Sequence, residues 1–275
     1  AQGRLLTNKD PNTPPTLIKN HPDVQRMLYF QKAIVEGSMG LLFQCFMWDD
    51  LAKSLEGEEK KEAQMMLDLM TTVAKTYPAE MGILAVNQGL QVLGGYGYTE
   101  DFPLEQMARD VRIMSIYEGT TGIHGLTLLG RGIPANNGAA LQTLGKLVYA
   151  DIAGAKGHES IAKYAGLLEK ELENLTKVTM HKLGFAMKGE IEVFLADSTL
   201  YMELFGLITV AWQWLKQGHV AAAALAKGGL SAEDEAFYKD KIHTMKFFYH
   251  YEVPKALGLS TRLMDEEVLT IFDNK

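Results

Sequence analysis

The sequence predicts an all-α protein, an up-and-down helical bundle followed by a second helical bundle. Three observations support this fold class. Apolar residues recur at three- and four-residue spacing over long stretches. Residues that start and stop helices separate these stretches. No window shows the alternating β-branched pattern of a strand. With 275 residues and 47% hydrophobic content, the chain is large enough for one large domain or two ordinary ones.

The first half is expected to begin with two long helices. Pro22 and Asp23 suit a first helical turn, because proline there loses no hydrogen bond and the acid meets the positive end of the helix dipole. A second helix should start after Gly57 with the acidic segment "EEKKEA" and stop at the double glycine 94–95. Pro78 is expected to kink or restart this helix.

Shorter elements should follow. We expect "YGYTEDFP" to be an ordered loop and "LEQMARDVRIMSIYEG" to contain a short helix. Another helix should run through "GIHGLTLLGR", with either Thr120 or Thr121 as its N-cap. The segment "GIPANNG" then has the composition of a linker. It divides the chain into predicted domains 1–133 and 134–275.

Four further helical stretches are expected in the second domain. Their predicted ranges are 139–153, 158–184, 190–227 and 232–257. The segment "GLSAEDE" is typical of a turn followed by a helix cap, and it precedes the last stretch. Trp212, Trp214 and the Met-rich helices are interpreted as core or interface material, because flexible Met often fills irregular cores.

Composition excludes several classes of function. The net charge of -7 and pI near 5.6 argue against a nucleic-acid-binding protein or one that coats anionic lipid. The single cysteine, Cys45, excludes an intrachain disulfide and predicts a buried packing role in a reducing, cytoplasmic compartment. No apolar run reaches the roughly 20 residues that cross a bilayer, so no membrane span is expected. Because the chain starts at Ala1 without Met, it is expected to be a piece of a longer protein.

Common catalytic motifs are missing. No Glu is followed three residues later by His, as a di-iron bundle requires, so no metal is predicted. There is no Gly-x-Ser-x-Gly elbow and no phosphate loop ending in Gly-Lys-Ser or Gly-Lys-Thr. The segment "GGYGY" follows a helix, whereas a dinucleotide-binding glycine loop follows a strand.

The stretch from Gln91 to Arg131 carries the strongest chemical pattern. Its glycines expose backbone amides, and Glu118 stands between apolar neighbours and the start of a helix. Exposed amides and a helix N-terminus favour an anion, and a carboxylate in a dry pocket acts as a base. The alternative is that the glycines only stop helices and that Glu118 lies in a half-exposed loop. The pattern of residues alone leaves both open.

This stretch resembles the long signature of the acyl-CoA dehydrogenase family. The similar elements are Gln-x-x-Gly-Gly-x-Gly, then Arg-Asp-x-x-Ile and Ile-Tyr-Glu-Gly-Thr within "QVLGGYGYTEDFPLEQMARDVRIMSIYEGTTGI". The similarity runs from His21 to Arg131. The segments "HPDVQRML" and "LLGR" resemble the larger members with an added helical C-terminal segment, the methylmercaptopropionyl-CoA dehydrogenase-like branch. The resemblance implies the C-terminal half of such an enzyme.

The resemblance also implies a catalytic residue. Glu118 matches the glutamate that abstracts the α-proton of an acyl-CoA thioester while a hydride leaves the β-carbon for the flavin N5. Its pKa must then be raised toward the operating pH by apolar surroundings and loss of water. Tyr117 and Gly119 would contact substrate, with Gly119 letting the thioester approach the backbone.

The implied cofactor is FAD. Gln91, Gly94 and Gly95 match residues that touch the diphosphate region across a subunit interface, so at least a homodimer is expected. Thr120 matches a flavin-contacting residue, and Gly122 stands where several relatives have Gln. Electron-transfer flavoprotein is the expected electron acceptor.

Two rival functions remain from the sequence. One is a catalytically silent relative that serves as a helical assembly module, although retention of Glu118 argues against it. The other is a related flavoprotein oxidase.

Family members carry a helical domain and a β domain ahead of the matching region, so this chain alone is expected to be an inactive fragment. The segment "RDVR" is interpreted as a structural ion-pair turn, and Tyr96 and Tyr98 either flank the flavin or form a packed loop.

Overall fold

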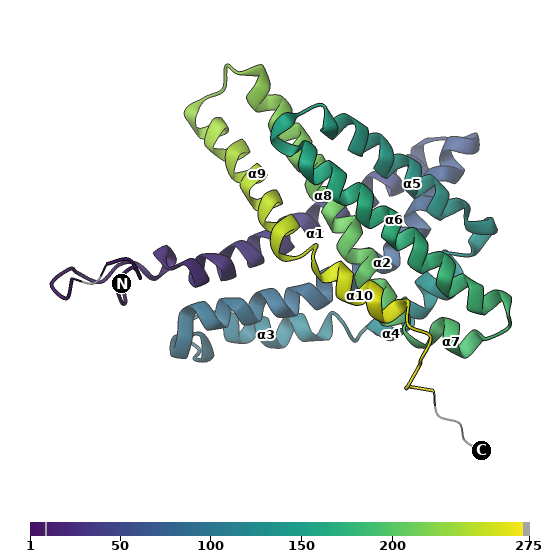
Figure 1. Ribbon diagram of the computed structural model, residues 1–275, viewed down its shortest axis with the longest axis horizontal. Helices are drawn as coiled ribbons and strands as arrows, with labels where there is room; N and C mark the ends of the chain where they lie inside the picture. The colour runs from purple at the N-terminus through teal and green to yellow at the C-terminus, as the bar shows by residue number, and fades with distance from the viewer. Residues whose placement is uncertain (9, 272–275) are drawn as a thin grey trace.

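The computed structural model describes residues 1–8 and 10–271, and within these residues the regular elements are helices, with no strand. The all-α prediction is therefore confirmed. Figure 1 shows a helical body from which the N-terminal segment and the start of α1 extend to one side. The elements are η1 (Ile18–Asn20), α1 (Pro22–Ser54), α2 (Gly57–Leu93), η2 (Gly94–Tyr98), α3 (Leu104–Ile113), α4 (Thr121–Thr127), η3 (Leu128–Gly132), α5 (Ala135–Lys156), α6 (Glu159–Met187), α7 (Ile191–Ala196), α8 (Ser198–Lys227), α9 (Ala232–Tyr251) and α10 (Lys255–Leu263).

The two long helices of the first half begin and end as expected. Pro22 occupies the first turn of α1 and Asp23 supplies its acidic residue. Two glutamates supply the first turn of α2, which ends at Gly94 with a φ of 61°. A positive φ at this position favours glycine, because a Cβ would crowd the backbone there.

Helix α2 runs unbroken through Pro78, so the expected restart at this proline is wrong. Proline removes one intrahelical hydrogen bond, and neighbouring packing must offset that loss. Here Tyr77, Ala79 and Met81 are all buried around the proline, in the core against which α2 packs. Tertiary burial therefore keeps this helix continuous where local sequence favours a break.

The second half differs from its predicted helix ranges at two places. The stretch 190–227 is two helices, because the backbone leaves the helical region at Asp197 between α7 and α8. The stretch 232–257 is also two, since α9 ends at Tyr251 and α10 follows Pro254. The predicted cap is confirmed, because the Ser231 hydroxyl accepts a hydrogen bond from the Asp234 amide at 3.0 Å.

The linker after η3 is a left-handed turn. Asn136, Asn137 and Gly138 have φ values of 49°, 57° and 76°, so the regular part of α5 starts after them. Asparagine and glycine are the residues that adopt this conformation most easily. The segment "GIPANNG" therefore contains a turn ahead of the regular part of α5.

Helix α8 lies at the centre of the bundle, between the α5–α6 pair and the α1–α2 pair (Figure 1). Its residues from Leu204 to Leu215 are buried without interruption. The indole Nε1 of Trp214 donates to the Ala33 carbonyl of α1 at 2.9 Å, and the Tyr249 hydroxyl of α9 donates to the Ala211 carbonyl at 2.9 Å. The two predicted domains therefore share one hydrophobic core, in which Trp212 and Trp214 are buried.

Cys45 lies in this core with an exposed fraction of 6%. Burial raises the pKa of its thiol to about 11, so the side chain stays a neutral thiol at physiological pH. The predicted packing role is confirmed.

Candidate active site

Glu118 lies in the loop between α3 and α4, with backbone geometry that few non-glycine residues adopt. Its φ is 52° and that of the following Gly119 is 96°. Such left-handed conformations cost free energy for a residue with a side chain, and they persist where surrounding contacts hold them. The Glu118 side chain is exposed, next to the half-exposed Ile116 and Tyr117.

Two side chains hold the backbone around Glu118. Lys75 of α2 donates from Nζ to the carbonyl oxygen of Gly119 at 2.6 Å. The His124 Nε2 atom of α4 lies 3.1 Å from the carbonyl oxygen of Glu118 itself. A Cβ on Gly119 would lie 2.9 Å from the same His124 nitrogen, so the glycine lets the ring approach. The backbone carbonyls of Glu118 and Gly119 are thus both held by side chains of neighbouring helices.

The start of α4 anchors the other end of this loop. The Thr120 hydroxyl accepts from the Ile123 amide, which identifies Thr120 as the N-cap. The Thr121 hydroxyl donates instead to the Glu80 carboxylate of α2. Of the two candidate caps, Thr120 therefore caps the helix and Thr121 ties the loop to α2. Gly122 follows in the first turn, where a Cβ would lie 3.9 Å from the Thr120 hydroxyl oxygen, an ordinary van der Waals contact.

Gln91, Gly94 and Gly95 lie at the far end of α2 from this loop. All three are exposed, and a Cβ built on either glycine would meet nothing within 4 Å. Lys75, which holds the Glu118 loop, is sixteen residues before Gln91 on the same helix. At 1.5 Å per residue this is about 24 Å along the helix. Within one chain, the structure keeps these residues apart from Glu118.

Both arginines of "RDVR" contact neighbours on α3 or just after it. Arg109 forms an ion pair with Glu105, and Arg112 donates to the Ser115 hydroxyl. The interpretation of this segment as a structural turn of ion pairs therefore holds for Arg109. Tyr96 and Tyr98 are 67% and 89% exposed, so the loop packs neither ring into the protein.

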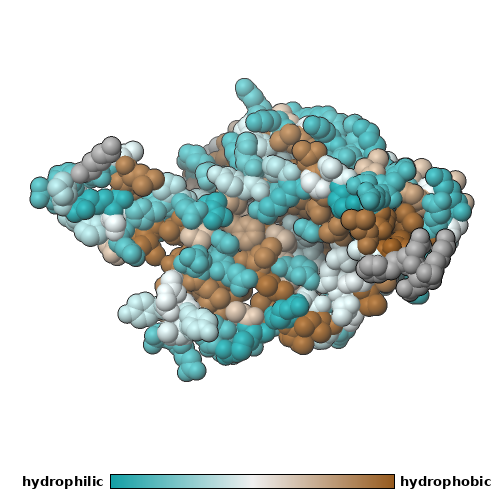
Figure 2. Space-filling view, turned by 60° about the horizontal axis from the view of Figure 1, so that its bottom comes forward, coloured by the Kyte–Doolittle hydropathy of each residue, from teal (hydrophilic) through white to brown (hydrophobic). Residues whose placement is uncertain are grey.

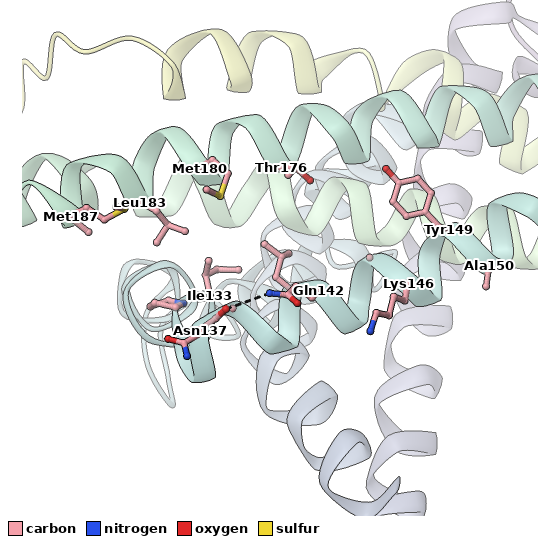
Figure 3. Close-up of a pocket in the computed structure, with 15 residues that line it drawn as sticks. Ile133, Asn137, Gln142, Lys146, Tyr149, Ala150, Thr176, Met180, Leu183 and Met187 are labelled. Atoms are coloured by element: carbon pink, nitrogen blue, oxygen red, sulfur yellow. Dashed lines mark hydrogen bonds between the residues drawn. The ribbon is translucent and has the colours of Figure 1, made fainter. Parts of the chain in front are cut away.

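A groove of about 1290 Å³ lies elsewhere, between α5 and α6 (Figure 3). Leu183, Met180 and Met187 line one wall, and the facing wall carries Tyr149 and Lys146. Sequence reasoning missed this groove, because its walls come from two helices and neither helix shows an unusual motif. None of the residues predicted to bind substrate or cofactor lines it.

The described residues contain no candidate for a membrane-spanning helix or for a metal site. No helix there is long and apolar enough to cross a membrane. No group of three or more His, Cys, Asp or Glu side chains in residues 1–8 and 10–271 has the arrangement of a metal site.

The fold and the site together define a class of protein. It is a helical bundle with a carboxylate on a loop just before the start of a helix. Family models match most of the chain: "Acyl-CoA dehydrogenase, C-terminal domain" matches residues 19–133, and "Acetyl-CoA dehydrogenase C-terminal like" matches residues 143–271. The chain belongs to the acyl-CoA dehydrogenase family and corresponds to its C-terminal half.

Two curated relatives illustrate the similarity. A broad-specificity linear acyl-CoA dehydrogenase of Mycobacterium tuberculosis is 31% identical over 100% of this chain and 45% of its own length. The 3-methylmercaptopropionyl-CoA dehydrogenase of Ruegeria pomeroyi is 30% identical over 90% of this chain and 42% of its own length. The chain therefore spans less than half the length of these relatives.

Solved structures share the fold. Caenorhabditis elegans ACDH-11 in complex with C11-CoA gives a TM-score of 0.69 at 23% identity, over 86% of this chain and 37% of that one. An acyl-CoA dehydrogenase from Bacillus anthracis complexed with FAD gives 0.67 at 19% identity, over 93% of this chain and 44% of that one.

Proposed function

We propose that this chain is the C-terminal helical part of an FAD-dependent acyl-CoA dehydrogenase, in which Glu118 takes the α-proton of an acyl-CoA thioester. The observation that carries the proposal is the position of Glu118, on a left-handed loop held by Lys75 and His124 inside the segment that matches the family. A base must be held at a defined position relative to the proton that it abstracts.

We assign a role to each residue of the loop from its match to the family. Glu118 accepts the proton on its carboxylate, and Gly119 is proposed to contact the thioester through its backbone, because the His124 ring fills the place that a side chain would take. Tyr117, which is 45% exposed, offers an aromatic wall to the acyl chain. Because Glu118 is exposed in this chain, substrate and the remaining part of the enzyme must exclude water around it.

The residues assigned to the cofactor fit a large anionic group. Gly94 and Gly95 leave exposed backbone with open space, which lets a diphosphate approach their amides. Thr120 presents its exposed side chain at the start of α4, and Gly122 carries no side chain next to it. FAD, when bound, would supply the group that accepts the hydride leaving the β-carbon of the substrate. Electron-transfer flavoprotein is proposed as the next acceptor.

The separation along α2 supports a homodimer. Gln91 and the glycine pair lie about 24 Å along the helix from the residue that holds the Glu118 loop, so we assign them to the site of a neighbouring copy. Exposed apolar side chains appear in clusters on the face shown in Figure 2. Separately from this view, α1 has exposed apolar side chains at Met39, Phe43, Phe46 and Met47, each 47% exposed or more. These residues are proposed as part of the dimer contact.

A catalytically silent assembly module is the alternative function. The exposed apolar surface of α1 would serve it equally well.

The chain alone is proposed to be inactive, because half of a ligand site leaves polar groups of the cofactor unpaired. A cytoplasmic location is proposed from the single, buried Cys45.

The test is Glu118→Gln in the full-length enzyme, because the amide keeps the shape and cannot accept the proton. Loss of a positioned base lowers turnover by about 10² to 10⁴-fold, and flavin content and acyl-CoA binding should stay near the wild-type values. Glu100→Gln, at an exposed glutamate outside the loop, is the control. Turnover of the Glu118 variant within a few-fold of wild type would place the base elsewhere.

A further inference from the structure

A second pocket, of about 400 Å³, lies between the start of α1, the start of α6 and one face of α9. His243, Lys246, Phe247 and His250 come from α9 at spacings of three, four and seven residues, so they share one face of that helix. This volume is in the range of small-molecule sites, which runs from about 300 to 1,000 Å³. None of the residues assigned to Glu118 chemistry or FAD lines it.

The pocket concentrates positive charge in an acidic protein. Arg26 of α1 and Lys246 of α9 line it together with two histidines, and no Asp or Glu is among its lining residues. Lys246 takes part in none of the ion pairs found among the described residues. Arg26 pairs with the exposed Asp23 at 2.8 Å, which leaves its other guanidinium nitrogens for a second partner. These cations favour an anionic ligand.

Aromatic rings line the same pocket. Tyr251 and Phe247 stack with ring centroids 4.4 Å apart and planes at 11°, and Tyr251 is 53% exposed. Tyr29 lies against His243 at a centroid distance of 4.7 Å. On the third wall, the Tyr164 hydroxyl lies 3.2 Å from His250 Nε2. A flat ring can therefore stack on an exposed tyrosine within reach of the two cations.

We propose that this pocket binds a nucleotide, with the base stacked on Tyr251 and the phosphate paired with Lys246 and Arg26. A simple inorganic anion would leave the aromatic walls unused. A long nucleic-acid strand would face the repulsion of a protein with net charge -7. The ligand is a free nucleotide or the nucleotide end of a larger molecule such as coenzyme A, because both carry the same ring and phosphate.

The experiment is calorimetric titration of the protein with ATP, 3′,5′-ADP, coenzyme A and inorganic pyrophosphate at low salt. At least one nucleotide should bind at a single saturable site, and more tightly than pyrophosphate. Lys246→Gln should weaken nucleotide binding at least about tenfold, the effect expected for loss of a charged hydrogen-bond partner. Tyr251→Ala should weaken it about tenfold by removing the stacking surface, and should leave pyrophosphate binding unchanged.

Lys227→Gln is the matched control, because it removes one exposed lysine charge at the end of α8, outside the pocket. Thermal unfolding of all three variants should match wild type, since these side chains lie at the surface or at the pocket wall. Coenzyme A binding as tightly as 3′,5′-ADP would identify the nucleotide end of a thioester as the source, and ATP binding without coenzyme A would identify a free nucleotide. Absence of saturable nucleotide binding, or equal weakening by Lys227→Gln, would overturn the proposal.

Discussion

Lys75 and Gly119 are joined by a hydrogen bond of 2.6 Å, from the lysine Nζ to the glycine carbonyl oxygen. The bond connects the middle of α2 to the residue directly after Glu118, across 44 positions of sequence. The same ammonium group lies 6.0 Å from the centre of the Tyr117 ring. One lysine therefore contacts both neighbours of the proposed base.

The first prediction concerns this lysine. Lys75→Met keeps most of the side-chain volume and removes the hydrogen bond, so the loop should lose its fixed position. A displacement of about 1 Å can lower turnover about 10²-fold. In the full-length enzyme we expect kcat to fall by about one to two orders of magnitude, with FAD content and KM little changed. Lys75→Arg should recover part of the loss, and Lys227→Met should have no effect. A kcat equal to that of wild type would show that the bond does not position Glu118.

The second prediction separates a cofactor contact from a helix stop. Gly94 has a φ of 61°, so any side chain there strains the fold itself. Gly95 lacks a positive φ and has open space around it, so this chain accepts a side chain at that position. In the full-length enzyme, Gly95→Val should lower FAD occupancy while the Tm of the apo form stays within a few degrees of wild type. Gly166→Val on α6, where space is also open, should leave FAD occupancy unchanged. Full occupancy in the Gly95 variant would remove this residue from the cofactor site.

The third prediction concerns assembly. Phe43 and Phe46 contact each other edge to face on the exposed side of α1 and are 62% and 58% exposed. Phe43→Glu should convert a dimer to a monomer at micromolar concentration in light scattering, because a charge in an apolar interface costs several kcal/mol unless it is paired. Leu257→Glu, on the exposed side of α10, is the control and should leave the mass unchanged. A wild-type monomer with full flavin occupancy would contradict the dimer proposal.

The fourth prediction is a pH dependence of stability. Glu252 is 3% exposed, and burial raises the pKa of its carboxyl above the ordinary value of 4.5, although Lys255 opposes this by pairing with the charged form. Because the folded state holds this proton more tightly than the unfolded state, protonated Glu252 stabilises the fold, and the stabilisation is fully present below pH 4.5. It is lost as pH rises through the folded-state pKa of Glu252. Glu252→Gln should therefore gain stability relative to wild type as pH rises from 4 to 7, measured by chemical denaturation. A constant difference across that range would exclude the effect.

Sequence patterns alone predicted the helical class, the ends of the first two helices and the cap at Ser231. These features depend on residues a few positions apart, such as the Ser231 hydroxyl and the Asp234 amide, so they are visible along the chain. The family resemblance likewise identifies Glu118 within the segment that matches the signature. The roles of Glu118, Gln91, Gly94, Gly95, Thr120 and Gly122 in catalysis or cofactor binding stay predictions.

Tertiary structure decided the rest, because the deciding contacts join residues distant in sequence. Pro78 stays helical through burial of its neighbours, and a periodic pattern cannot show which side of α2 is covered. The sequence also gives no sign that Lys75 reaches the Gly119 carbonyl or that Lys246 and Arg26 face one pocket, since those pairs form only when separate helices pack. Local sequence thus determined where helices begin and end, and long-range packing determined which side chains meet.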